Sequence, residues 1–307
     1  MQMKDAVIVS AVRTAGARGK KDGGLATVHP VDLSAEVLKA VVQRVKLDPA
    51  LVDDVLWGCA MPEGAQGLNI ARLGVLRAGF PVDVSAATVN RFCSSGLQTV
   101  AMAAQSIMTG LCDVVIAGGI EMMSAVPMGG FHTRLHPEMT EENIGMGFTA
   151  ERVARQWSIT RDQADDFALG SQQKAAAAWQ RNAFAHEIVP VPVPRVTWKG
   201  GQKTTEMTRF AVDELVRAET TREGLGKLKP AFAAKGVVTA GNSSPLSDGA
   251  AALLLMSADK AKELGLRPLA RFVTFATAGV APDIMGVGPI KAVPKALGKA
   301  GLTLCDM

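Results

Sequence analysis

The residues best suited to carry chemistry surround a cysteine in the segment Asn90-Arg91-Phe92-Cys93-Ser94-Ser95-Gly96. A run of β-type residues, Ala87-Thr88-Val89, precedes it. Apolar residues follow it at helical spacing, namely Leu97, Val100, Ala101, Ala104, Ile107 and Met108. Cys93 is therefore predicted at a turn from a strand into a helix, where unpaired N–H groups and the helix dipole favour a thiolate. An inert, buried cysteine is the alternative, because free cysteine is among the most buried residue types.

Two further stretches accompany this segment in a fixed order. They are Gly118-Gly119-Ile120-Glu121-Met122-Met123-Ser124 and Thr239-Ala240-Gly241-Asn242-Ser243-Ser244-Pro245-Leu246-Ser247-Asp248-Gly249-Ala250. Together the three motifs resemble those of the thiolase family, the enzymes that make and break 3-ketoacyl-CoA. The resemblance runs from the first strand to the last residue, and it is closest to the degradative, acyl-transferring branch of the family.

The first 121 residues alternate apolar strands with amphipathic helices. Strands are predicted at Ala6–Val9, 54–58, 87–89 and 113–117, and helices over about 33–45, 69–77 and 97–110, the first of them capped by Asp32. His29-Pro30 reads as a turn leading into that helix, and Gly118-Gly119 as a tight turn after a strand. Such alternation predicts an α/β protein with a mostly parallel sheet covered by helices on both faces.

The alternation lapses from about residue 122 to residue 245, which predicts an inserted domain. Thr160 and Gln163 form a capping box for a long alanine-rich helix to about Arg181. Valine and proline alternate over 189–194, which indicates an edge strand or an extended linker. Strand character returns at 251–256, with Ser257 as a helix cap. A further strand is expected at 271–275, and a helix near 294–299.

The resemblance implies a thiolase fold of five layers, αβαβα, with mixed, mostly parallel sheets. It divides the chain into an N-terminal half (1–121), an inserted loop domain (122–245), a return to the N-terminal half (246–268) and the start of the C-terminal half (269–307). By the same resemblance, the sequence stops before the Asn-Glu-Ala-Phe, Gly-His-Pro and Cys-x-Gly segments of the family. The C-terminal half is thus expected to be incomplete, and the chain alone to have little activity.

The resemblance also assigns roles to individual residues. Cys93 is the expected nucleophile and acyl carrier, and its own backbone N–H is an expected oxyanion donor. The expected residues of the coenzyme A site are Arg217 at the nucleotide end, Phe232 beside the adenine or pantetheine, Ala240 and Ser244 along the pantetheine, and Met146 and Met285 at the acyl pocket. His29 and Cys305 are not expected to replace the missing groups, because their flanking residues do not match those of the family. The remaining histidines lie in polar contexts and are expected at the surface, namely His132, His136 and His186.

Three functions compete at this point. The leading one is CoA-dependent cleavage of 3-ketoacyl-CoA, or the reverse condensation, through an acyl-cysteine on Cys93. The second is a catalytically incomplete fragment that binds CoA thioesters, or a half that depends on a partner chain. The third is a ketoacyl synthase, which shares the cysteine at a helix start but which the motif from Thr239 to Ala250 disfavours.

The composition of the chain disfavours some classes of binding partner. The 307 residues carry 33 Lys and Arg against 29 Asp and Glu, a formal net charge of +4 without basic blocks, which disfavours nucleic acid. No apolar run is long enough for a membrane span or a signal peptide. Four cysteines without metal or disulfide spacing indicate a reducing compartment, so a cytoplasmic location is expected. The resemblance implies coenzyme A as the substrate, with no permanent cofactor and no metal. It also implies a homodimer of the complete protein, because the segment from Phe131 to Asn143 is shorter than the loop that forms tetramers in relatives of the biosynthetic branch.

Overall fold

The computed structural model describes residues 3–142, 145–200 and 202–307. It divides into two compact units. The first comprises Met1–His132, Phe184–Leu215 and Leu246–Phe272, and the second comprises Thr133–Ala183, Val216–Pro245 and Val273–Met307. The domain boundaries inferred from the sequence, at residues 121, 245 and 268, stay predictions.

The first unit is built on one mixed sheet. Its strands are β1 (Ala6–Arg13), β2 (Ala17–Arg18), β3 (Asp54–Gly58), β4 (Ser85–Val89), β5 (Val114–Met122), β8 (Ser247–Ser257) and β9 (Ala270–Arg271). They pair in the order β4-β3-β5-β8-β1-β9, with β2 beside β8. Between the described strands of this sheet, the parallel pairings are those of β3 with β4 and with β5.

The prediction of a mostly parallel sheet was wrong in one respect. β1, β3, β4 and β5 do run in one direction. However, β8 lies between β5 and β1 and is antiparallel to both, and the short strands β2 and β9 also pair antiparallel. The antiparallel pairings therefore outnumber the parallel ones, because the strand that enters after residue 245 takes a central place.

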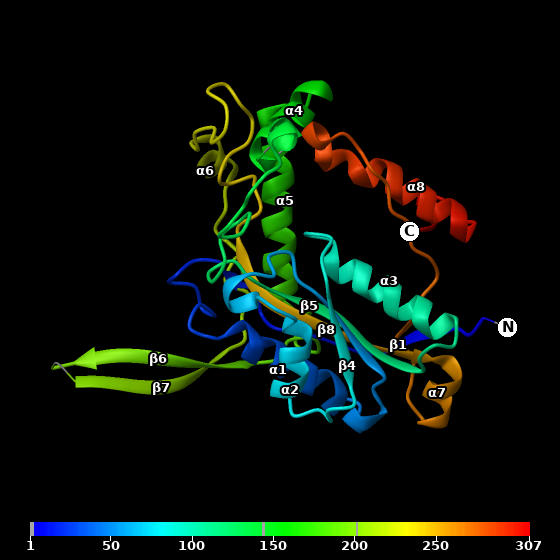
Figure 1. Ribbon diagram of the computed structural model, residues 1–307. Coiled ribbons are helices and arrows are strands. Elements are labelled where there is room, and N and C mark those ends of the chain that lie inside the picture. The colour runs from blue at the N-terminus through cyan, green and yellow to red at the C-terminus, as the bar shows by residue number, and fades with distance from the viewer. Residues whose placement is uncertain (1–2, 143–144, 201) are drawn as a thin grey trace. The chain divides into compact units, whose positions relative to one another are not determined.

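Helices cover both faces of this sheet, as predicted (Figure 1). On one face lie α1 (Pro30–Gln43) and α2 (Ile70–Arg77), whose apolar residues pack with those of the strands around the buried Trp57. On the other face lies α3 (Ser95–Met108), which packs Ala103, Ala104 and Ile107 against the sheet. A short helix, α7 (Ala258–Glu263), follows β8 and is capped by Ser257 as predicted.

Two local predictions in this unit need correction. His29, not Asp32, caps α1, because its Nδ1 accepts the N–H of Val31 at 3.2 Å and Pro30 occupies the first helical position. The turn expected at Gly118-Gly119 is instead the middle of β5. A Cβ at Gly118 would come within 2.1 Å of the carbonyl oxygen of Ala251, so glycine is required there by close strand packing and not by a turn.

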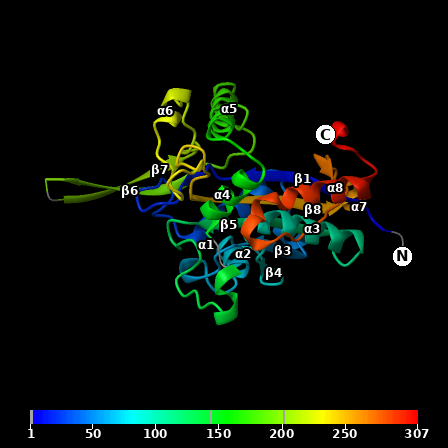
Figure 2. The same cartoon turned by 90° about the horizontal axis from the view of Figure 1, so that it is seen from above.

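A long hairpin completes the first unit. It consists of β6 (Val191–Lys199) and β7 (Gln202–Phe210), paired antiparallel as a separate two-stranded sheet, and it reaches away from the larger sheet in Figure 1 and in Figure 2. Each strand is thus an edge strand, which confirms the reading of the valine-proline alternation. Arg13 of β1 anchors the ends of the hairpin through Glu187 at 2.7 Å and Asp213 at 2.7 Å.

The second unit is largely helical. Its helices are α4 (Met146–Gln156), α5 (Arg161–Gln180), α6 (Arg222–Gly226) and α8 (Gly288–Ala300). The capping box of Thr160 and Gln163 is present at the start of α5, as predicted. The helix expected near 294–299 lies within α8. The short 3₁₀ helices in the described part of both units are Pro49–Leu51, Gly64–Gln66, Pro137–Glu142, Pro282–Val287 and Leu304–Asp306.

Candidate active site

The thiol of Cys93 lies where the sequence predicted it, between the end of β4 and the start of α3. Ser94 is the N-cap residue of α3, so Cys93 directly precedes the cap. The side chain is exposed. Among the described residues the backbone N–H of Cys93 donates no hydrogen bond. An accessible thiol beside an unpaired N–H is the arrangement that acyl transfer through a cysteine needs.

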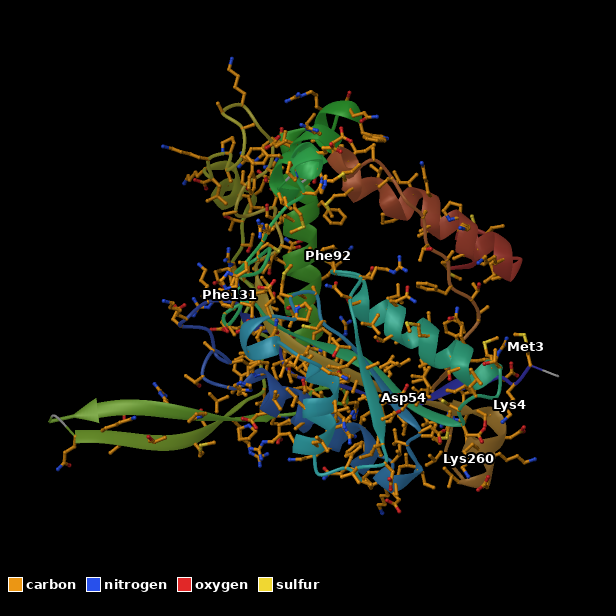
Figure 3. The ribbon with its side chains drawn as sticks, viewed as in Figure 1. Met3, Lys4, Asp54, Phe92, Phe131 and Lys260 are labelled. Atoms are coloured by element: carbon orange, nitrogen blue, oxygen red, sulfur yellow. The ribbon has the colours of Figure 1, made fainter. Side chains whose placement is uncertain are left out.

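The residue before the cysteine has an uncommon backbone conformation. Phe92 has a φ of 46°, in the left-handed region, and its side chain is 65% exposed. Figure 3 shows Phe92 at the turn that enters α3. Its N–H donates to Asn90 Oδ1 at 2.7 Å, and its carbonyl oxygen accepts from the N–H of Ser95 at 2.9 Å and from Ser95 Oγ. Both peptide groups of Phe92 are therefore held by side chains.

The start of α3 is packed directly onto the sheet. A Cβ on Gly58 of β3 would approach the backbone of Ser95 and Gly96 to 2.8 Å, so only glycine allows this approach. Thr99 Oγ1 lies 2.8 Å from the carbonyl oxygen of Gly96 and 3.0 Å from that of Gly118. The cysteine motif and the Gly118 motif are thus brought together by one helix turn.

A polar network that runs from the exposed Asn90 to the buried Gln66 supports the cysteine turn. The carboxylate of Glu121 accepts the N–H of Ala60 at 2.7 Å and Gln66 Nε2 at 2.8 Å. Gln66 is fully buried, and its Oε1 accepts the N–H of Met122 at 2.6 Å. Asn90 Nδ2 donates to the carbonyl oxygen of Ala60 at 3.0 Å. The sequence placed Glu121 in the motif that begins at Gly118 but did not indicate its role in this network, because the hydrogen bonds join segments far apart in the chain.

The four cysteines differ in environment. Burial raises the pKa of the Cys59 thiol to about 12, and the charge of Glu121 adds to the effect. Cys112 is half-buried and accepts a hydrogen bond from Ser106 Oγ at 3.1 Å. Cys305 is exposed, like Cys93, and lies in a short 3₁₀ helix. At neutral pH Cys59 is thus a neutral, inaccessible thiol, while Cys93 and Cys305 are open to solvent.

In the second unit, the Thr239 motif forms a tightly bonded turn. Asn242 Oδ1 accepts the N–H of Thr239 at 2.7 Å, and Ser243 Oγ donates to the carbonyl oxygen of Thr239 at 2.7 Å. Asn242 Nδ2 donates to Asp165 Oδ1 at 2.8 Å and to the carbonyl oxygen of Val237 at 2.9 Å. Ala240 and Ser244 are both exposed on this turn.

Asp165 of α5 joins the motif to its surroundings. It is fully buried, and its Oδ2 lies 2.8 Å from Arg161 Nε and 3.5 Å from Arg222 Nη1. Arg161 also donates to the carbonyl oxygens of Leu225 at 2.7 Å and Leu228 at 2.9 Å. Sequence reasoning missed Asp165. The available signal was a charged residue on the face of an alanine-rich helix that packs against the protein core. The sequence did not indicate which residues this carboxylate contacts.

Arg217 lies in the loop before α6, on the rim of a surface pocket of about 200 Å³. The other lining residues are Gln172, Glu219, Thr220, Thr221, Gly224, Leu225, Leu228 and Gly241. Gly241 belongs to the Thr239 turn, so this pocket brings the predicted arginine next to the predicted motif. Among the described residues Arg217 forms no ion pair, which leaves its guanidinium available to an anion.

The three remaining predicted residues gather around α4. Met146 is its first residue, and Met285 lies in the 3₁₀ helix Pro282–Val287, which packs against α4. The Phe232 ring meets that of Phe148 edge-on, with centroids 5.7 Å apart. A Cβ on Gly147 would collide with the Phe232 ring at 2.3 Å. The side chains of Met146, Phe232 and Met285 are 40–45% exposed, so they present an apolar surface.

Another residue that sequence reasoning missed supports the loop of Phe232. The buried carboxylate of Glu151 accepts the N–H groups of Val237 and Val238 at 3.0 and 2.9 Å. The same carboxylate lines an open pocket of about 450 Å³ with Arg155, Lys235 and Gly236. Within the described ranges, no three acidic, histidine or cysteine residues are grouped so as to hold a metal ion. No helix there is long and apolar enough to cross a membrane.

Comparison with known proteins identifies the family. The family model of the thiolase N-terminal domain matches residues 6–259, and that of the thiolase C-terminal domain matches residues 266–307. A 3-ketoacyl-CoA thiolase of Bacillus subtilis is 49% identical over 99% of this chain and 79% of its own length. An acetyl-CoA acetyltransferase of Escherichia coli is 44% identical over 99% and 79%.

The fold agrees with this result. The crystal structure of the Bacillus anthracis acetyl-CoA acetyltransferase matches with a TM-score of 0.88 and 39% identity, over 99% of this chain and 78% of that one. The chain therefore spans about four fifths of the length of the relatives that it matches. The expected thiolase fold is confirmed, and the chain belongs to the thiolase family.

Proposed function

We propose that this protein carries out CoA-dependent acyl transfer of the thiolase type, with Cys93 as its nucleophile. The observation that carries the proposal is the exposed thiol that directly precedes the N-cap of α3, beside its own unpaired N–H. Family membership supports the reaction class, and relatives that are named 3-ketoacyl-CoA thiolase and acetyl-CoA acetyltransferase support the substrate class.

In the cleavage direction, the Cys93 thiolate attacks the ketone carbon of a 3-ketoacyl-CoA. The bond between the second and third carbons then breaks, and its electron pair leaves as the enolate of acetyl-CoA, which takes up a proton. The shortened acyl group remains on Cys93 as a thioester. The thiolate of a second coenzyme A attacks that thioester and releases the acyl-CoA and free Cys93.

The local backbone suits both steps. Each attack converts a carbonyl oxygen into an oxyanion, and an unpaired N–H at Cys93 stabilises that charge without prior loss of another hydrogen bond. The positive end of the α3 dipole acts on the thiolate and on the oxyanion in the same direction. Cys93 thus serves as the acyl carrier and also supplies one oxyanion donor.

Coenzyme A is the proposed substrate for the second unit. The unpaired guanidinium of Arg217 suits an anionic phosphate, and its pocket continues to the turn that carries Ala240 and Ser244. The apolar surface of Phe232, Met146 and Met285 suits the pantetheine and the acyl chain. No permanently bound cofactor or metal is part of this proposal.

We also propose a homodimeric, cytoplasmic protein. Strand β4 lies at the end of the sheet, so its outer edge is open to pairing with a second chain. Part of the segment 131–143 that motivated a dimer, Asn143, lies outside the described residues. None of the four cysteines forms a disulfide, which suits a reducing compartment. Light scattering tests the assembly, and a tetramer at micromolar concentration contradicts it.

Acylation by acetyl-CoA tests the central proposal. Peptide mapping by mass spectrometry should find one acetyl group on Cys93, with release of one coenzyme A for each acylated chain. Cys93→Ala should abolish this acylation and the accompanying release of coenzyme A, while the control Cys305→Ala should retain both. Binding of acetyl-CoA without acylation of Cys93 would instead favour a protein that only binds CoA thioesters.

A further inference from the structure

We propose that Asn90 is a positioning residue for Cys93. Its side chain holds Phe92 in the left-handed conformation and so fixes the thiol ahead of the N-cap of α3. This inference deepens the proposed function and rests on it, because it takes Cys93 as the nucleophile. The proposed mechanism gives Asn90 no role of its own, although this residue belongs to the cysteine motif.

The left-handed backbone of Phe92 needs a cause. Residues with a Cβ avoid this region, and a bulky aromatic side chain has no local preference for it. Burial of the ring does not supply the cause, since the side chain of Phe92 is 65% exposed. The conformation, with φ of 46°, must therefore be imposed by hydrogen bonds to the backbone of the turn.

The side chains of Asn90, Ser94 and Ser95 hold the two peptide groups that flank Phe92. Ser95 holds the following one, because the carbonyl oxygen of Phe92 accepts from the N–H of Ser95 and from its Oγ. Asn90 Oδ1 holds the preceding one through the N–H of Phe92 at 2.7 Å. The angle φ describes rotation about the bond between N and Cα, so it is fixed only when the preceding peptide group is fixed. The carbonyl oxygen of that group, which belongs to Arg91, accepts from the N–H of Ser94 at 3.2 Å and from Ser94 Oγ at 2.9 Å. Asn90 therefore holds the N–H end of this peptide group, and Ser94 holds its carbonyl end.

The other end of the Asn90 amide is firmly anchored. Nδ2 donates to the carbonyl oxygen of Ala60 at 3.0 Å, and the N–H of Ala60 donates to Glu121 Oε2 at 2.7 Å. Glu121 belongs to β5, and the fully buried Gln66 holds its second oxygen at 2.8 Å. The path from β5 to the cysteine turn thus consists of consecutive short hydrogen bonds. Asn90 is the one exposed member of this path, so its replacement should leave the core intact.

Alkylation kinetics test the inference without any need for substrate. Iodoacetamide labels exposed thiols, and peptide mapping gives the rate at Cys93 relative to that at Cys305 in the same molecule. We expect Cys93 to react faster in the parent. Asn90→Ala should lower the ratio by about tenfold, because the thiol leaves its position at the helix start once Phe92 relaxes.

A second substitution separates positioning from direct contact. Glycine adopts positive φ without strain, so in a Phe92→Gly background the turn no longer needs the amide. Asn90→Ala in that background should change the ratio by less than about threefold. Asn90→Asp keeps an oxygen for the N–H of Phe92 and should retain more of the ratio than Asn90→Ala.

Asn69→Ala is the matched control. Asn69 also donates its amide to a backbone carbonyl, that of Ala86 at 2.9 Å, but it caps α2. The Asn69→Ala variant should leave the ratio of the alkylation rates at Cys93 and Cys305 unchanged. An unchanged ratio in Asn90→Ala overturns the inference alone, as does an equal loss in the Phe92→Gly background. If Cys93 reacts no faster than Cys305 in the parent, the proposed function fails and this inference fails with it.

Discussion

Two turns that carry predicted functional residues are each clamped by an asparagine, but the two clamps are anchored differently. Asn90 holds the turn before Cys93 and donates to a backbone carbonyl, that of Ala60. Asn242 holds the Thr239 turn and donates to a carboxylate, that of Asp165. Asn90 is exposed, whereas Asp165 is fully buried.

The difference decides what a substitution does in each turn. Loss of Asn90 frees groups that water can reach, so the position of the thiol changes while stability changes little. Loss of Asp165 leaves the guanidinium groups of Arg161 and Arg222 without their buried partner. Stability and ligand binding are therefore coupled in the Thr239 turn and separable in the cysteine turn.

The largest expected effect tests the buried anchor. Asp165→Ala should lower the free energy of unfolding by about 3 kcal/mol, because it removes one partner from an ion pair that is largely out of water. Urea unfolding followed by circular dichroism measures this. Asp162→Ala is the control, since Asp162 pairs with the same Arg222 but is exposed. Similar losses in the two variants would show that burial of the anchor does not matter.

Arg217 tests whether the turn anchored on Asp165 serves a ligand. Arg217→Ala should weaken coenzyme A binding by roughly 1.5–3 kcal/mol at low salt, because a charge-assisted contact to phosphate is lost. Calorimetric titration measures the affinity. Arg155→Ala changes the net charge equally and lies at the other pocket, so it should bind as the parent does. Equal weakening in both variants would indicate general charge attraction instead of a site.

The two asparagines can be compared directly. Asn242→Ala should lower the free energy of unfolding by about 1–2 kcal/mol, because it leaves Asp165 and the N–H of Thr239 short of a partner. Asn90→Ala should lower it by less than about 0.5 kcal/mol, as is usual at exposed positions. Thermal unfolding of both variants in the same buffer measures the two losses of stability. Equal losses would contradict the proposed difference between the turn held by Asn90 and the turn held by Asn242.

Asp248 is a buried carboxylate with no ion pair among the described residues, and its effect on stability depends on pH. Burial raises its pKa above the usual 3.8, so the unfolded chain loses this proton at a lower pH than the folded protein. As the pH rises above the usual carboxyl pKa of about 4, the parent should lose stability relative to Asp248→Asn, because the folded protein holds this proton more tightly than the unfolded chain does. Stability curves of both proteins test the sign, and a gain for the parent would contradict it.

Features that depend on residues close together in the sequence could be predicted, whereas features that depend on contacts between distant segments could not. The position of Cys93, the capping box at Thr160 and the cap at Ser257 depend on neighbours within a few residues, and all three were correct. The central place of β8 depends on pairing with strands more than 100 residues away, and local periodicity carries no such information.

The same distinction applies to the candidate site. The local pattern and the family resemblance indicated Cys93, and the resemblance alone indicated Arg217. Asp165 and the link from Asn90 to Glu121 emerge only when distant segments meet. The cap of α1 shows a further limit. His29 and Asp32 both have an acceptor suited to a helix start, and only the fold decides which of them is used.

The central position of β8 also sets the order in which the protein can assemble. β1 and β5 are synthesised early, but each must wait for β8, with Ala6 pairing with Ser257 and Val114 with Met256. The 124 residues between the end of β5 and the start of β8 take on the order of 6–25 s to translate at typical rates. Throughout that interval both strands expose unpaired apolar edges on the ribosome, so the nascent chain is a natural client for chaperones.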